Sequence, residues 1–315
     1  MDAPRRAFVT GGTGFVGSHL VRHLVESGDA VAVLRRPESD PWRIADVQDR
    51  VEVISGRLSE PAGLTGPLKA FQPDVVYHLG WFGSGPADRD DPRQLTENVA
   101  NSLALVELAA HAGATTWIGL GSQAEYGPTA SVLDESTPTR PVTAYGTAKL
   151  SAGRVTQHLC AMRSIRQIWL RLVTAYGPAD QPSYLIPQVI LRFLFGGRPA
   201  LTEGSQPGDF LNVSDACSAI RAAGLTESCA GTYVLASGDH RPVREVALTI
   251  RDLIDPRLEI GFGEVVPTVP PLGLRGDPRA LELVTGWSPK VSLEAGLAQC
   301  VDWYRQNLSR YTNEM

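Results

Sequence analysis

A glycine-rich turn near the N-terminus constrains the fold more than any other stretch of the chain. The apolar run Ala7–Val9 precedes it, and from Phe15 onward apolar residues recur at helical spacing. Between them, one glycine pattern (G-x-x-G-x-x-G) starts at Gly11 and a second (G-x-G-x-x-G) starts at Gly12. Glycines there permit a tight turn, close approach of a pyrophosphate to the backbone, and close packing of helix on strand. A strand, this turn and a helix in succession predict a dinucleotide-binding site with its phosphates at the helix N-terminus.

Apolar strands alternate with helical patterns over the first 175 residues or so. This alternation implies right-handed βαβ units, and therefore an α/β fold with a doubly wound parallel sheet. The predicted strands are Ala7–Val9, Ala30–Leu34, Val51–Ile54, Asp74–Leu79, Thr115–Ser122 and Gln167–Val173. The predicted helices begin at about Phe15 and cover Pro61–Phe71, Leu95–Ala112 and Val142–Cys160.

The pattern changes after Tyr176-Gly177-Pro178, where proline and glycine become frequent and the alternation is lost. We predict a dinucleotide-binding domain over residues 1–177, to which 209–238 returns, and a smaller, discontinuous substrate-binding domain within 178–315. Its place would be over the carboxyl edge of the sheet, where open α/β sheets bind ligands. Four helices and one strand are expected here: Pro187–Phe195, Val213–Leu225, Val243–Ile254, Leu293–Asn307 and the strand Thr232–Ala236.

Composition and charge narrow the class of protein. The 315 residues carry a net charge of −5, which gives no electrostatic footprint for nucleic acid or an anionic membrane. The first strand begins too early to leave room for a signal peptide, and no apolar run reaches the length of a membrane span. The four cysteines are scattered, which favours reduced thiols over disulfides or a metal site. We therefore expect a cytoplasmic protein without a bound metal.

Three residues form a candidate catalytic group. Ser122 ends a predicted buried strand, and Tyr145 and Lys149 lie one helical turn apart in the sequence YGTAK. An ammonium beside a phenol favours the phenolate, so we expect Lys149 to lower the pKa of Tyr145 toward neutral pH. Tyr145 would then exchange a proton with a carbonyl or hydroxyl oxygen that Ser122 holds by a hydrogen bond.

With these motifs, the chain resembles the extended short-chain dehydrogenases/reductases of the nucleotide-sugar epimerase/dehydratase type. The similarity runs through TGGTGFVGSHL (10–20), YHLG (77–80), GSQAEYGP (121–128), YGTAK (145–149), LRLVTAYGP (170–178) and GDFLNVSDAC (208–217). It implies a Rossmann-type fold, and Ser122, Tyr145 and Lys149 as the catalytic triad. It also implies that Lys149 hydrogen-bonds the nicotinamide ribose, and that the Asn98 and Tyr145 helices form the four-helix bundle of a homodimer.

The predicted cofactor is NADP(H), with NAD(H) as the alternative. Where the family usually has an acid for the adenosine ribose of NAD, this chain has Arg35 and then Arg36, which would bind a 2′-phosphate. Arg57 stands where an acid often holds adenine. The full set of expected cofactor contacts is Gly11, Gly14, Phe15, Val16, Gly17, Arg35, Arg36, Arg57, Leu58, Leu79, Gly80 and Lys149.

The expected substrate site departs from the family pattern. Dehydratases have an Asp-Glu pair after the triad serine or threonine, whereas here Gln123 and Ala124 follow Ser122, which argues against dehydration. The arginine common at the position of Gly208 is missing, which leaves Arg198 and Arg275 as the nearest cationic candidates for a diphosphate. The predicted substrate contacts are Trp81, Phe82, Gln123, Thr174, Arg198 and Arg275.

Two smaller features complete the expectations. His78 lies in a buried strand, and we interpret it as a structural histidine rather than a base. Asn98 either caps the helix that follows or positions a loop near the site.

The resemblance and its departures favour an NADPH-dependent ketoreductase that acts on a nucleotide-linked 4-keto-6-deoxyhexose in deoxysugar biosynthesis. Two alternatives stay open. One is a nucleotide-sugar epimerase with bound NAD, and the other is a ketoreductase for a non-sugar natural-product ketone.

Overall fold

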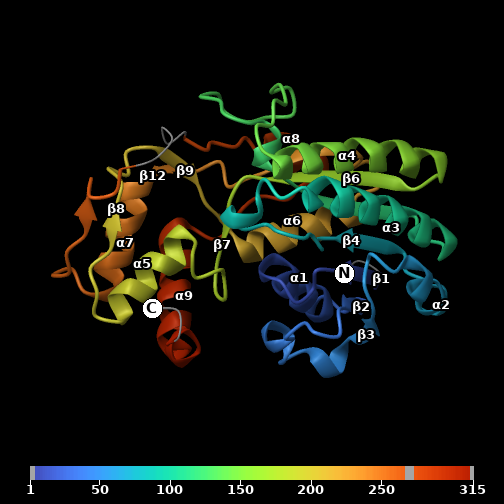
Figure 1. Ribbon diagram of the computed structural model, residues 1–315, viewed down its shortest axis with the longest axis horizontal. Helices are drawn as coiled ribbons and strands as arrows, with labels where there is room; N and C mark the ends of the chain where they lie inside the picture. Colours follow the sequence, from blue (N-terminus) through green and yellow to red (C-terminus); the bar gives the residue numbers. More distant parts are fainter. Residues whose placement is uncertain (1–3, 267–272, 313–315) are drawn as a thin grey trace.

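The computed structural model describes residues 4–266 and 273–312, and a seven-stranded parallel sheet forms its centre (Figure 1). The strand order is β11-β6-β5-β4-β1-β2-β3, and every neighbouring pair is parallel. The order reverses at β1, so β1 and β4 border the crevice where such sheets bind ligands. The strands are β1 (Arg6–Thr10), β2 (Ala30–Arg35), β3 (Glu52–Ser55), β4 (Val75–His78), β5 (Thr116–Ser122), β6 (Arg166–Leu172) and β11 (Gly231–Leu235).

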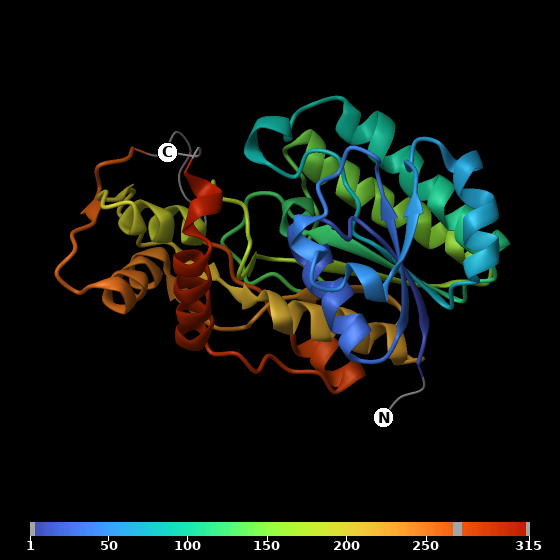
Figure 2. The ribbon, with the colours of Figure 1, turned by 90° about the horizontal axis from the view of Figure 1, so that it is seen from below.

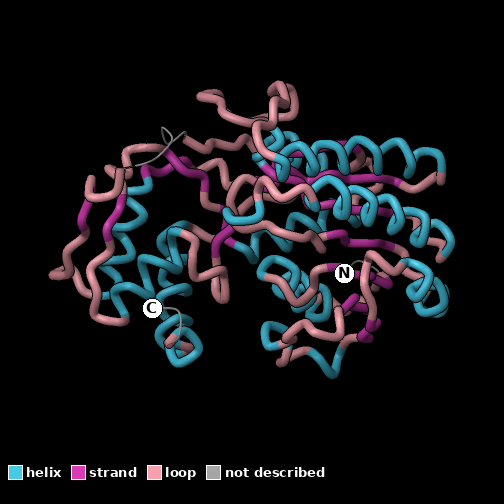
Figure 3. Tube along the Cα trace, viewed as in Figure 1, coloured by secondary structure: helices cyan, strands magenta, loops and turns pink. Residues whose placement is uncertain are grey.

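Helices cover both faces of the sheet (Figures 1 and 3). Alternate strand residues point to opposite faces, so Ala7 and Val9 enter one core while Phe8 enters the other. The first core lies under α1 (Phe15–Glu26), α6 (Val213–Leu225) and α8 (Arg279–Thr285). The second lies under α2 (Pro61–Phe71), α3 (Ala100–His111) and α4 (Ala144–Met162). The α/β, Rossmann-type doubly wound sheet expected from the sequence is therefore confirmed.

The rest of the chain forms a lobe with its own core. In Figure 2 this lobe lies to the left of the sheet, and α5 (Leu185–Leu194), α7 (Val243–Ile254) and α9 (Leu293–Gln306) surround its buried residues. Short strand pairs complete it: β7 (Ala175–Tyr176) with β10 (Leu211–Asn212), β8 (Ala200–Leu201) with β13 (Gly261–Phe262), and β9 (Pro207–Asp209) with β12 (His240–Pro242). The domain boundaries at 177, 209 and 238 stay predictions.

One predicted helix differs in its first turns. The segment expected as a single helix over Leu95–Ala112 begins with the π-helical turn η4 (Gln94–Val99) before α3. Two side chains of this wider turn, Gln94 and Asn98, are buried. Gln94 accepts a hydrogen bond from the Trp81 indole at 2.8 Å. Asn98 bonds both the N–H and the carbonyl of Phe82, at 2.8 and 3.1 Å. Asn98 therefore positions the loop after β4, and no side chain caps α3.

Short 3₁₀ turns occupy several connections of the chain. They are η1 (Trp42–Ile44), η2 (Gln48–Arg50), η3 (Pro86–Asp88), η5 (Gln123–Glu125) and η6 (Leu308–Tyr311). No helix within the described residues combines the length and apolar character needed to cross a bilayer. The helices α3 and α4 lie side by side on the outer face of the sheet, where Val155 and Met162 are exposed (Figure 1). A homodimer formed through these helices stays a prediction.

Candidate active site

The turn between β1 and α1 is shaped for the close approach of a ligand to the backbone. Gly11 has a φ of +73°, and a Cβ atom on it would lie 2.7 Å from the backbone nitrogen of Gly80. A Cβ on Gly17 would overlap the carbonyl of Gly11. Gly14 precedes α1, whose first turn holds neither an acidic residue nor a capping side chain. Helix N–H groups left open in this way fit the pyrophosphate of a dinucleotide.

The ends of β1 and β4 meet beside this turn. The N–H groups of Leu79 and Gly80 donate to the carbonyl and hydroxyl of Thr10, at 3.2 and 3.0 Å. His78 is buried and sits between two hydroxyls, with Nδ1 2.9 Å from Thr10 Oγ1 and Nε2 3.0 Å from Ser102 Oγ. Burial lowers the pKa of His78 to about 3. His78 is therefore the structural histidine that the sequence predicted, and it stays neutral.

Arginines gather beyond the ends of β2 and β3, but they are not equally available. Arg57 forms two bonds to the carboxylate of Glu38, at 2.6 and 2.8 Å, and the Nε of Arg36 is 3.8 Å from the same carboxylate. Arg35 ends β2, and Leu58 packs against the second core. Glu38 thus offsets part of the positive charge expected at a 2′-phosphate, and Arg57 is occupied by it. The sequence motifs did not predict that Glu38 would pair with these arginines.

The structure brings Ser122, Tyr145 and Lys149 together. Ser122 ends β5, while Tyr145 and Lys149 lie in the first two turns of α4, whose N-cap is Thr143. The ammonium of Lys149 donates to the carbonyl of Leu120 at 2.7 Å. It lies 3.7 Å from the centre of the Trp81 ring and 5.9 Å from that of Tyr145. These residues thus share one compact cluster at the carboxyl end of the sheet.

The expected effect of Lys149 on Tyr145 is wrong. Burial raises the pKa of Tyr145 above its usual value, and the lowering influences come from Ser122 and the guanidinium of Arg89. Burial also lowers the pKa of Lys149 to about 7, against an opposing influence of Glu125. Removing both groups from water penalises both of their charged forms, and this cost exceeds their mutual benefit. The phenol therefore stays protonated at neutral pH, which suits a proton donor.

Two aromatic candidates follow β4. Trp81 packs edge-on against Tyr145, with ring centres 6.3 Å apart, and also covers Lys149. Phe82 is held by Asn98 and lies under the guanidinium of Arg93, 4.0 Å from its ring centre. Trp81 therefore belongs to the site cluster, and Phe82 forms part of the loop beside it.

Glu125, an acid one position later than the dehydratase pair, is a residue of the site that the sequence motifs did not predict. Its carboxylate is fully buried and accepts hydrogen bonds from the Ser122 N–H at 3.0 Å, the Trp169 indole at 2.9 Å and the Arg171 Nε at 2.7 Å. The sequence Ser-Gln-Ala-Glu does fit a capping box, in which the fourth residue turns back to the first, and this was the available signal. Because Glu125 points under the end of β5, it is not placed as an acid or base for substrate.

The substrate candidates separate into two groups. Gln123 follows Ser122 directly, and Thr174 follows β6 at the same edge of the sheet. Arg198, however, binds Glu264 at 2.6 and 2.8 Å near β8 and β13, at the outer edge of the second lobe (Figure 1). Arg275 donates to the carbonyl of Ala130. Arg198 is therefore not brought to the site, and Arg275 is occupied by a backbone carbonyl.

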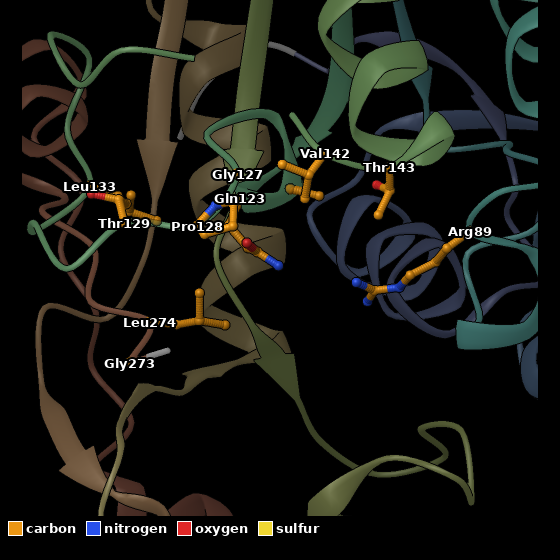
Figure 4. Close-up of a pocket in the computed structure, with 11 residues that line it drawn as sticks. Arg89, Gln123, Gly127, Pro128, Thr129, Leu133, Val142, Thr143, Gly273 and Leu274 are labelled. Atoms are coloured by element: carbon orange, nitrogen blue, oxygen red, sulfur yellow. The ribbon is translucent and has the colours of Figure 1, made fainter. Parts of the chain in front are cut away.

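A cavity of about 160 Å³ is lined by chain neighbours of the triad, among them Gln123 after Ser122 and Thr143 before Tyr145 (Figure 4). Gln123, Thr143 and Arg89 contribute its polar wall, while Leu133 and Leu274 are among its apolar residues. Arg89 was not among the expected site residues, because it lies in a loop without a motif. Its carbonyl accepts the N–H of Tyr145 at 2.8 Å, and its guanidinium lies 5.9 Å from the ring centre of Tyr145. Within the described ranges, no group of three or more potential metal-binding His, Cys, Asp and Glu side chains occurs.

The buried ion pair under Ser122 gives a stability prediction. We expect Glu125→Gln to lower the free energy of unfolding by about 3–5 kcal/mol, because it leaves the Arg171 cation buried without a counter-charge. The matched control is Glu107→Gln, which breaks the exposed ion pair with Arg163 and should cost at most about 1 kcal/mol. Urea unfolding measures both, and equal losses in the two variants would contradict the assigned role of Glu125.

Comparisons with known proteins agree with this architecture. The model of the NAD dependent epimerase/dehydratase family matches residues 7–236. The chain is 29% identical to dTDP-glucose 4,6-dehydratase of Mycobacterium tuberculosis, over 96% of this chain and 94% of the relative. It is 27% identical to GDP-6-deoxy-D-mannose reductase of Pseudomonas aeruginosa, over 95% and 97%. The solved structure of UDP-glucose 4-epimerase from Thermotoga maritima aligns with a TM-score of 0.86 and 23% identity, covering 96% of this chain and 99% of that one.

The matched region contains the glycine turn, the parallel sheet and all three triad residues. Relatives of this kind are extended short-chain dehydrogenase/reductase enzymes that act on nucleotide sugars with a nicotinamide dinucleotide. The chain is therefore an enzyme that belongs to the NAD-dependent epimerase/dehydratase family.

Proposed function

We propose that this enzyme is an NADPH-dependent ketoreductase that reduces the 4-keto group of a nucleotide-linked 4-keto-6-deoxyhexose. The observation that carries the proposal is the cluster of Ser122, Tyr145 and Lys149 without a second acid or base pair beside it. Gln123 and Ala124 occupy the two positions after Ser122, and Glu125 is turned into the protein and paired with Arg171. The relative named GDP-6-deoxy-D-mannose reductase supports a reductive role.

Ser122, Tyr145 and Lys149 each have a separate role in the proposed carbonyl reduction. The dinucleotide, when bound on the glycine turn, supplies the hydride. Tyr145, whose raised pKa keeps the phenol protonated, donates its proton to the carbonyl oxygen as negative charge develops there. Ser122 holds the same oxygen by a hydrogen bond, and the Lys149 ammonium stabilises the negative charge left on the phenol. Water then returns a proton to Tyr145, and the product is a secondary alcohol.

Epimerisation is the second candidate function. The fold matches the solved UDP-glucose 4-epimerase, and the same triad can serve oxidation followed by re-reduction. Arg35 and Arg36 favour the reductase, because an enzyme that retains NAD gains from an acid beside the adenosine ribose. Net consumption of NADPH with a nucleotide 4-ketosugar distinguishes the two, since an epimerase consumes none.

Removal of the phenol tests the proton donor. We expect Tyr145→Phe to reduce kcat for NADPH-dependent carbonyl reduction by about 10²-fold or more, because the ring stays while the donor is lost. Binding of NADPH, measured by fluorescence titration, should change little. Undiminished turnover in this variant would remove Tyr145 from the mechanism.

Cofactor preference tests the arginines after β2. We expect a higher kcat/KM with NADPH than with NADH, and a loss of about tenfold of that preference in Arg35→Gln, since one guanidinium–phosphate pair is removed. NADH, which lacks the 2′-phosphate, is the internal control and should be used equally well by both enzymes. A wild-type preference of tenfold or more for NADH would refute the assignment.

The pKa of Lys149 gives a pH prediction. The ammonium is charged below its pKa of about 7 and neutral above it, so its help is present at pH 6 and is lost as the pH rises. We expect kcat/KM for reduction to decline above pH 7 by about tenfold per pH unit, as for a single ionisation. Lys149→Met should lack this decline. A profile that is flat from pH 6 to pH 8.5 in the wild type would contradict it.

A further inference from the structure

Arg89 is a partly buried cation that the proposed mechanism does not use. It follows η3 in the loop after β4, and its Nε is buried without a hydrogen-bond partner among the described residues. The two acids that follow it in the chain contact other groups. Asp90 accepts the N–H of Ala144 at 3.0 Å, and Asp91 pairs with Arg93 at 2.7 Å. A guanidinium presented to a cavity in this way lacks the oxyanion that such a group binds best.

A second hydrogen-bonding side chain faces the guanidinium. In Figure 4 the side chains of Arg89 and Gln123 point toward one another across the cavity. Apolar residues complete the lining, among them Leu133, Val142 and Leu274. A volume of about 160 Å³ is close to that of an engineered cavity that holds benzene, so it accommodates one ring or one charged group and not a whole nucleotide sugar.

The two cations expected to bind a diphosphate from the second lobe both contact groups of the protein. Arg198 is held by Glu264 in a two-point ion pair, and Arg275 is held by the carbonyl of Ala130. Arg89 approaches the site from the opposite side, from the sheet domain. Its guanidinium carbon is 5.9 Å from the ring centre of Tyr145, so a group bound to it lies within about one sugar ring of the reacting carbonyl.

We propose that Arg89, together with Gln123, binds a phosphate of the diphosphate of the nucleotide-sugar substrate. This inference rests on the proposed function, because it assumes that the sugar carbonyl meets Tyr145. It assigns the anion contact to the loop after β4 and not to the second lobe. The planar guanidinium can donate two parallel bonds to phosphate oxygens, with Gln123 as a further donor.

Calorimetric titration of the NADP⁺-loaded enzyme tests the assignment without turnover. The probes are UDP, dTDP, GDP and inorganic pyrophosphate, and glucuronate, a sugar carboxylate without phosphate, is the comparison. We expect the wild type to bind at least one of the phosphate probes more tightly than glucuronate, and Arg89→Gln to weaken that binding by about 10- to 100-fold, the value of a hydrogen bond to a charged group. Arg89→Lys, which keeps the charge but not the planar fork, should lie between the two.

Arg163→Gln is the matched control, since it also removes one positive charge but at the far end of α4, and it should bind every probe like the wild type. Wild-type affinity for none of the probes, or equal affinity of the wild type and Arg89→Gln, overturns the proposal. Should Arg89→Gln fail to fold, the comparison with Arg89→Lys decides, and equal affinities again overturn it. NADPH oxidation with a nucleotide 4-ketosugar is measured separately, so loss of probe binding in Arg89→Gln without any such oxidation would refute the reductase and leave the anion site standing.

Discussion

A buried carboxylate holds the catalytic edge of the sheet together. Glu125 joins the Ser122 N–H to two side chains of β6, Trp169 and Arg171, and so ties the end of β5 to its neighbour. A buried charge is tolerated only when it is paired and hydrogen-bonded, and Glu125 has three donors. These three bonds therefore fix the backbone of the turn that presents Ser122.

The same burial governs the acid–base chemistry above this turn. Trp81 covers both Tyr145 and Lys149, which removes the two groups from water together. Desolvation then keeps the phenol protonated and makes the ammonium easy to deprotonate near neutral pH. A protonated phenol is the form that reduction of a carbonyl requires. The buried environment thus supports the proposed role of Tyr145 as a proton donor, which the spacing of tyrosine and lysine alone does not indicate.

The arginines near the proposed cofactor and substrate sites differ in whether another group of the protein binds them. Several arginines of this chain look suitable by position, but Arg57, Arg198 and Arg275 are bound to groups of the protein itself. Arg35 and Arg89 differ from them, since neither an ion pair nor a side-chain hydrogen bond in the described part of the chain involves either one. One stands beside the expected adenosine ribose and the other beside Tyr145, so the cofactor and the substrate would each meet one arginine.

The sequence by itself determined the fold class, the glycine turn and the pairing of Tyr145 with Lys149 on one helix face, because these follow from local periodicity and from the alternation of strands and helices. That Ser122 joins this pair followed from the family resemblance of the motifs. Only the tertiary structure decided which arginines are free, where Glu125 points and in which direction the pKa of Tyr145 moves. The physical reason is that ion pairing and desolvation depend on distances between segments far apart in the chain. Glu38 reaches Arg57 from the end of another strand, and the loop that holds Arg89 carries no pattern that marks it.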